Sequence, residues 1–212
     1  MCNFLCIEQF MVLHFISITV TFCRTTTMRD LQPLRRLHRG LQQLATAQRY
    51  LFTPADMRAL LPDLSDSAYR TVLSRAANDS TLIRLCRGLY LYTPAKPNQG
   101  LVLYHAAARL RANNLNYISL ESALSDAGVI SQVPLNWLTL MSSGRTQTIR
   151  CGTFGTLEFI HTRRKATDLQ GQVDYDERCR LWRAKPTLAL ADMKRAKRSL
   201  DLIDWEIANE LV

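Results

Sequence analysis

Hydroxyl and guanidinium side chains recur every three to four positions between Ser65 and Asn78. In a helix, this spacing places such side chains on one face. Arginine donates two hydrogen bonds to one guanine edge, serine and threonine hydroxyls bond phosphates or base edges, and an α-helix fits the major groove of DNA. The candidate DNA-contacting residues on this face are Ser67, Arg70, Thr71, Ser74 and Arg75.

Two further arginines lie at a predicted hairpin. Residues 82–85 and 89–92 have the apolar and aromatic composition typical of strands, and Gly88 ends the turn between them, where a positive φ costs glycine little. We expect Arg84 and Arg87 on this hairpin to contact phosphates or the minor groove. The alternative for every one of these arginines is a solvated basic surface without a ligand.

The first element needed to position these side chains is a helix over residues 30–47. Leucines recur there at intervals of three and four, which predicts one apolar stripe. Three arginines are expected on its solvent side. They are Arg35, Arg36 and Arg39. A β-prone run follows at residues 50–53.

Two helices joined by a tight turn are predicted next. The first begins at Thr53-Pro54, where threonine caps the helix and proline fits its first turn, and it ends at Pro62. The second begins at Ser65 or Asp66 and runs to about Asn78. Its buried stripe is expected to be Tyr69, Val72, Leu73 and Ala76. With the hairpin, these elements predict a winged helix-turn-helix domain over residues 28–95.

The charge distribution favours a polyanionic partner for the first half of the chain. The formal net charge is +9. Residues 28–112 hold 13 lysines and arginines against 5 acidic residues, whereas residues 113–212 hold 13 against 12. Because the basic excess coincides with the predicted DNA-binding domain, double-stranded DNA is the expected partner.

The sequence contains no recognisable catalytic or metal-binding constellation. Its four histidines have no nucleophile or carboxylate at a catalytic spacing, and its six cysteines form no CxxC pair or Cys/His cluster. Asp174, Asp176 and Glu177 are expected to be a solvated loop, with a metal site as the alternative, and Cys86 is expected to be an inert thiol, with a redox-active thiol as the alternative. We therefore predict no enzyme activity, catalytic residue, cofactor, metal or disulfide framework, and a reducing, cytoplasmic location.

Residues 1–27 are apolar and need a separate interpretation. The uninterrupted apolar stretch from Phe10 to Cys23 is shorter than the roughly 20 residues that span a bilayer, and the segment lacks the positive start of a signal peptide. We expect translation to start at Met28, with residues 1–27 as a non-native leader and no membrane association. A membrane anchor is the alternative.

Residues 100–212 are predicted to form a mixed α+β domain after a linker at residues 93–100, so the whole chain is expected to be α+β. Residues 168–185 are expected to be loop and short helix. The predicted helices are 101–111, 119–126, 187–197 and 199–211, and the predicted strands are 137–141, 146–150 and 156–160. The inward-facing residues of the last two helices are expected to be Leu188, Leu190, Ala191, Leu200, Ile203, Ile207 and Leu211.

Several segments are similar to one known family. The run Tyr-Ile-Ser-Leu-Glu-Ser-Ala-Leu at residues 117–124 and residues 128–132, 154–161 and 186–192 resemble the second domain of AbiEi-type antitoxins of bacterial type IV toxin–antitoxin systems. Arg-Gly-Leu-Tyr at residues 87–90 agrees with the wing of that family's N-terminal domain. The resemblance covers nearly everything after the expected start.

The resemblance implies a protein with two roles. The first domain would bind operator repeats and repress its own operon. The antitoxin domain, residues 100–212, would counteract a nucleotidyltransferase-type toxin, often without a stable complex, and several family members serve in phage defence. Two alternatives stay open. One is a stand-alone winged-helix regulator whose second domain senses a ligand or forms a dimer, and the other is a nucleic-acid-processing enzyme.

Overall fold

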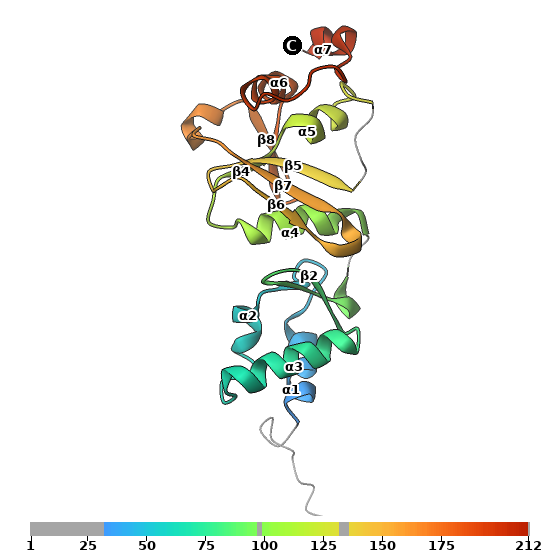
Figure 1. The fold of residues 1–212 in the computed structure, drawn as a ribbon, viewed down its shortest axis with the longest axis vertical. Helices are drawn as coiled ribbons and strands as arrows, with labels where there is room; N and C mark the ends of the chain where they lie inside the picture. The colour runs from blue at the N-terminus through green and yellow to red at the C-terminus, as the bar shows by residue number, and fades with distance from the viewer. Residues whose placement is uncertain (1–31, 97–98, 132–135, 212) are drawn as a thin grey trace, which may run out of the picture.

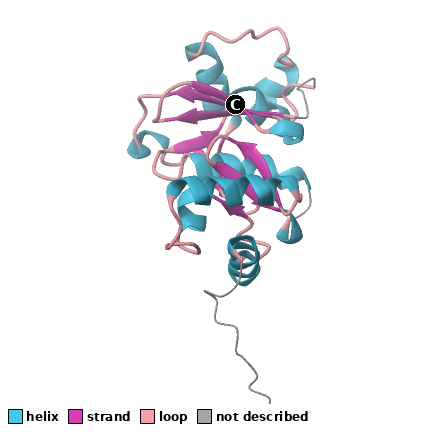
Figure 2. Cartoon of the chain, turned by 60° about the horizontal axis from the view of Figure 1, so that its bottom comes forward, coloured by secondary structure: helices cyan, strands magenta, loops and turns pink. Residues whose placement is uncertain are grey.

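Helices and strands are mixed along the whole described chain. The computed structural model describes residues 32–96, 99–131 and 136–211 (Figure 1). Within these ranges lie seven α-helices and two β-sheets, which confirms the α+β class predicted from the sequence. Figure 2 shows the strands gathered into two groups with helices around both. The predicted leader, residues 1–27, lies outside the described ranges.

The first part of the chain contains three helices and a three-stranded antiparallel sheet. Its elements are α1 (Pro33–Leu44), β1 (Leu51–Phe52), α2 (Pro54–Arg58), α3 (Asp66–Asn78), β2 (Leu82–Cys86) and β3 (Leu89–Tyr92). The strand order is β1-β3-β2. These positions match the predictions, except that α1 begins later, at Pro33, and both α1 and α2 end earlier. α1 stops at Leu44 because Ala45 is extended and the Thr46 hydroxyl accepts from the amides of Gln48 and Arg49.

Side-chain hydrogen bonds explain where α2 and α3 begin. The Thr53 hydroxyl accepts from the Asp56 amide at 3.2 Å, and the Asp56 carboxylate accepts from the Thr53 amide at 2.7 Å. The Ser65 hydroxyl accepts from the Ala68 amide at 3.3 Å. Because these caps satisfy N–H groups that a helix leaves without partners, each start is encoded locally.

The three-stranded sheet is buried on both faces. One face packs against α1, α2 and α3, where the buried stripe predicted for α3 is confirmed. The other face packs against the second part of the chain. The sheet residues in the first of these clusters are Phe52, Leu82 and Tyr92, and those in the second are Leu51, Leu85, Leu89 and Leu91.

A six-stranded mixed sheet forms the centre of the second part. Its elements are α4 (Val102–Leu110), β4 (Asn116–Ile118), α5 (Leu120–Asp126), β5 (Trp137–Ser142), β6 (Gln147–Arg150), β7 (Thr156–His161), β8 (Val173–Asp176), β9 (Leu181–Ala184), α6 (Pro186–Arg195) and α7 (Trp205–Leu211). Four 3-10 helices lie at Thr93–Ala95, Gln99–Leu101, Gly152–Phe154 and Ala166–Leu169. The strand order is β6-β7-β5-β4-β9-β8, with parallel pairs β5–β7 and β4–β9. The helix α4 lies on the side of this sheet that faces the first part, and α5 and α6 lie on the other side (Figure 1).

The prediction of loop and short helix for residues 168–185 is wrong, because β8 and β9 form an antiparallel hairpin there. The carboxylate of Asp176 accepts from the amides of Arg178 and Cys179, both at 3.0 Å, and so closes the turn. Asp174 and Tyr175 on the outer strand are exposed. An edge strand of this kind lacks the apolar alternation on which strand prediction depends.

The last two predicted helices are corrected in length and facing. Helix α7 starts at Trp205, and Ile203 instead forms a β-bridge with Ile130. In α6, the exposed Ala191 is followed by the fully buried Asp192, so the inward face is shifted by one position. Of the predicted inward residues, Leu188, Leu190 and Ile203 are buried and Leu200 is half-buried, whereas Ala191, Ile207 and Leu211 are exposed.

Candidate nucleic-acid interface

The five candidate residues of α3 share one exposed face, opposite the stripe that packs into the core. The Thr71 hydroxyl donates to the Ser67 carbonyl at 3.1 Å, one turn earlier in the helix. Arg70 and Arg75 form no ion pair with any residue in the described ranges. The exposed residues are Ser67, Arg70, Thr71, Ser74 and Arg75. Their exposure agrees with the predicted face.

Arg58, the last residue of α2, positions α3. Its guanidinium donates to the carbonyls of Leu61 and Leu64, the latter at 2.6 Å, and lies 5.2 Å from the ring centroid of Tyr69. The Tyr69 hydroxyl donates to the Pro54 carbonyl at 2.5 Å. These contacts tie α2, the following turn and α3 together. The orientation of the exposed arginines therefore depends on a side chain that the sequence analysis does not single out.

The prediction that Arg36 lies on the solvent side of α1 is wrong. Arg36 is buried, and its guanidinium donates to the two oxygens of Asp63 at 2.8 and 2.5 Å. Such a two-pronged, charge-assisted pair fixes α1 to the turn between α2 and α3. Arg36 borders the apolar stripe next to Leu37, where a long side chain can bury its stem and reach a partner. Arg35 and Arg39 are exposed as predicted.

The two hairpin candidates, Arg84 and Arg87, are also exposed. Arg84 lies opposite Tyr90, and a register shift separates it from Cys86. Gly88 has a φ of 83°, so the predicted turn glycine is confirmed. Neither arginine forms an ion pair with the part of the chain that the structure describes. The hairpin thus adds two guanidinium groups to those that α3 exposes.

Polar contacts join the first part to the second. The Tyr50 hydroxyl donates to Nδ1 of His105 at 2.6 Å, and His105 Nε2 donates to the Arg178 carbonyl at 2.7 Å. Because a carbonyl only accepts, these partners assign the proton of a neutral ring to Nε2. Burial lowers the pKa of His105 below 6.5, against the hydrogen bond to Arg178, which raises it. At the same border Arg109 donates to Asp56 at 2.6 Å.

A buried carboxylate lies within the second part. Asp192 on α6 is fully buried and accepts from the hydroxyls of Tyr117 and Ser119, both at 2.9 Å. Arg164 donates to its other oxygen at 3.0 Å. Ser119 is therefore bonded to Asp192, and its hydroxyl does not cap α5. Both oxygens have donors, as the burial of a charge requires.

A second group of cations lies on the second part of the chain, and the sequence analysis does not mark it. A hollow of about 310 Å³ is lined by Arg163, Arg195 and His161 together with three apolar residues. Its signal in the sequence is two basic runs, residues 161–165 and 194–198. The small net charge of residues 113–212 conceals these runs, because that sum includes acidic residues placed elsewhere. The lining favours an anion.

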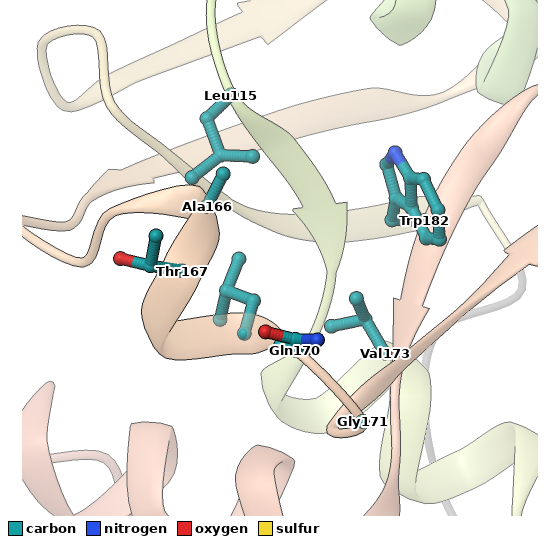
Figure 3. Close-up of a pocket in the computed structure, with 8 residues that line it drawn as sticks. Leu115, Ala166, Thr167, Gln170, Gly171, Val173 and Trp182 are labelled. Atoms are coloured by element: carbon teal, nitrogen blue, oxygen red, sulfur yellow. The ribbon is translucent and has the colours of Figure 1, made fainter.

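An apolar hollow of about 480 Å³ opens beside the 3-10 helix Ala166–Leu169 (Figure 3). Trp182 and Val173 lie on one side of it and Leu115 and Ala166 on the other. Among the described residues that line it, none is acidic, basic, histidine or cysteine. This lining offers no titratable side chain for acid–base catalysis.

Of the three acidic residues at positions 174, 176 and 177, Asp176 is bonded within the β8–β9 hairpin, whereas Asp174 and Glu177 are exposed. Burial favours a higher pKa for Asp176, but hydrogen bonds from Arg183 and the Cys179 amide lower that pKa to about 2. Across residues 32–96, 99–131 and 136–211, no three histidine, cysteine or acidic side chains lie together as metal ligands would. In the same ranges, every helix is too short or too polar to cross a bilayer.

A scan against protein-family models, a search of curated proteins and a search of solved structures each found no match for this chain. A function must therefore be argued from the chain's own residues.

Replacement of Arg58 by alanine should lower the free energy of unfolding by about 1–3 kcal/mol, because two carbonyls lose a charged donor. Urea denaturation of the full-length protein measures this loss. The control is Arg35→Ala, at an exposed position of α1. Its free energy of unfolding is expected to stay within about 0.5 kcal/mol of that of the unaltered protein. Equal stability of the two variants would contradict the positioning role of Arg58.

Stability should also fall as the pH drops below 6.5, in part through His105. The folded pKa of His105 lies below 6.5, so the unfolded chain binds a proton there that the folded protein does not. The contribution is complete above pH 6.5 and declines as the pH falls toward the folded pKa. Melting temperatures at pH 7.5 and 5.5 should differ less for His105→Gln than for the unaltered protein. An identical difference would show that His105 is not the titrating group.

Proposed function

We propose that this chain is a cytoplasmic transcriptional repressor that binds double-stranded DNA and is also the antitoxin of a type IV toxin–antitoxin system. Residues 28–95, of which the structure describes 32–95, would form a winged helix-turn-helix. The element order supports this assignment: α2 and α3 are joined by a turn, and the β2–β3 hairpin follows as the wing. The short strand β1 completes the wing sheet.

The observation that carries the DNA-binding proposal is the exposed face of α3. Arg70 and Arg75 project from it without an ion pair in the described ranges, while Arg36 and Arg58 are bonded within the fold. A guanidinium that no protein group occupies is available to guanine edges or phosphates. Ser67 lies near the start of the same helix, where recognition helices contact bases. Arg84 and Arg87 would hold the flanking backbone.

The antitoxin role rests on the resemblance of the second part to AbiEi-type antitoxins. The functional counterpart would be a nucleotidyltransferase-type toxin, and a stable complex with it is not required. We assign no catalytic residue, metal or cofactor to the chain. The residues that line the apolar hollow beside Trp182 include no titratable side chain. This lining counts against the alternative of a nucleic-acid-processing enzyme with its active site there.

A second candidate function is a stand-alone regulator whose second part binds a small molecule. The apolar hollow of about 480 Å³ favours it, because pockets for drug-sized ligands have roughly 300–1,000 Å³ and mostly apolar walls. Trp182 is 44% exposed at this hollow and so could stack on an aromatic ligand. The two candidates differ in whether the protein neutralises a toxin.

The double variant Arg70→Ala, Arg75→Ala should weaken operator binding by at least about thirtyfold, since each contact is worth about 1–3 kcal/mol. A gel-shift titration with the DNA upstream of the reading frame measures this. The affinity of the unaltered protein should fall with salt, by a slope of roughly 0.9 for each neutralised phosphate.

The control for this experiment is a second double variant, Arg145→Ala, Arg178→Ala, which removes the same charge from exposed positions outside α3. It should bind DNA far better than the α3 variant. Equal binding by both variants, each with an unchanged circular dichroism spectrum, would refute the role of the α3 face.

The same α3 variant separates repression from toxin neutralisation. It should still rescue cells that express the neighbouring toxin from an independent promoter, because α3 is distant in sequence from the antitoxin segments. Point variants of the full chain suit this test better than deletion of residues 28–95, which would uncover Val102 and Ala106 on α4. Failure of the unaltered, folded protein to rescue would favour the stand-alone regulator.

A further inference from the structure

Two free cysteines meet where the three-stranded sheet contacts the second part of the chain. Cys86 is the last residue of β2, and Cys151 follows directly after β6. β2 contacts both β6 and the 3-10 turn Gly152–Phe154, so the two thiols lie close enough to affect each other although the residues are far apart in sequence. Cys151 is fully buried, whereas Cys86 is partly exposed. The Cys86 thiol is thus accessible to a small oxidant, whereas the Cys151 thiol is shielded from solvent.

The surrounding backbone holds the two residues together. Strand β2 packs beside the 3-10 turn Gly152–Phe154, and Cys151 directly precedes this turn. The Cys151 amide donates to the Gly155 carbonyl at 2.7 Å and closes that turn. Cys86 packs against the buried cluster to which Cys151 belongs. The contact between the sulfurs therefore belongs to the packed junction.

The two thiols differ chemically. The hydrogen bond with Cys151 lowers the pKa of Cys86, burial opposes this shift, and the charge of Arg84 adds to it. The same hydrogen bond, together with burial, raises the pKa of Cys151. Because the thiolate is the nucleophilic form, Cys86 is the attacking member and Cys151 keeps its proton.

We propose that Cys86 and Cys151 form a reversible intramolecular disulfide when the protein meets hydrogen peroxide. The Cys86 thiolate attacks a peroxide oxygen, the O–O bond breaks, and a sulfenic acid and hydroxide form. The Cys151 sulfur then attacks the Cys86 sulfur, the S–O bond breaks, and the hydroxyl leaves with the Cys151 proton as water. The two sulfurs lose two electrons, and peroxide is reduced to hydroxide and water.

The disulfide would join the wing hairpin covalently to the second part. The closed loop runs from Cys86 to Cys151 and includes the connection at residues 93–101, so separation of the two parts would be restricted. Arg87 lies directly beside this link. The inference concerns the thiols alone and does not depend on the proposed function.

Cys179 provides a matched control within the same chain. It is buried, and burial raises its pKa to about 12, with Asp176 adding to the shift. Its sulfur lies 3.7 Å from a guanidinium nitrogen of Arg183. A thiol of this kind reacts slowly with peroxide.

The test treats the full-length protein with hydrogen peroxide, blocks free thiols and digests it with trypsin without reduction. Trypsin releases Cys86 in residues 85–87 and Cys151 in residues 151–163, so mass spectrometry identifies the disulfide as these two peptides joined. The joined peptide should form with peroxide and be lost with dithiothreitol.

Two variants complete the test. Cys86→Ser should abolish the joined peptide, and Cys179→Ser should leave it unchanged. The result with the unaltered protein can overturn the inference by itself, so the test does not depend on whether the variants fold. Sulfinic acid at Cys86 beside an alkylated Cys151, or Cys86 joined mainly to another cysteine, would do so.

Discussion

The three-stranded sheet is covered on both faces, and this double burial governs how the rest of the molecule is arranged. The side chains of β3 lie on both faces of the sheet. Leu89 and Leu91 pack against the second part, whereas Tyr92 packs against the helices of the first part. Strands this short form a weak sheet unless apolar surface covers them. Helices α1–α3 and the second part therefore stabilise one another through a sheet that belongs to both. The hydrogen bonds of His105 lie at this junction. Because hydrogen bonds are directional, they fix the relative orientation of the groups that the apolar contact brings together.

Two groups of arginines in the first part differ in their partners. Arg36 and Arg58 are bonded to carboxylate or carbonyl oxygens, and these bonds set the geometry of α1, α2 and α3. The other group is exposed and has no ion pair within the described ranges. It consists of Arg70, Arg75, Arg84 and Arg87. A net charge counts both groups alike. Only the structure shows which guanidinium groups are exposed and which are bonded to oxygens that position the helices.

Local signals predicted most of the first part, and contacts between distant residues account for what was missed. The cap at Thr53, the turn at Gly88 and the spacing along α3 act over a few residues, so the sequence contains them in full. Arg36 and Asp192 are kept inside by partners far along the chain, which pattern analysis does not see. Strand β9 depends in the same way on pairing with β4, and β8 joins the sheet through its pairing with β9. The exposure of the seven candidate residues agrees with expectation, whereas their contact with DNA stays a prediction.

The outer position of β8 in the six-stranded sheet has a consequence for solubility. An edge strand presents unpaired backbone groups, to which a strand of another molecule can add. β8 has four residues, Asp174 on it is exposed, and the exposed Glu177 follows directly. Two such acidic edges repel each other, so pairing of β8 with β8 of a second molecule is disfavoured. The charged side chains on β8 thus disfavour growth of the sheet at this edge, while β6 forms the opposite edge.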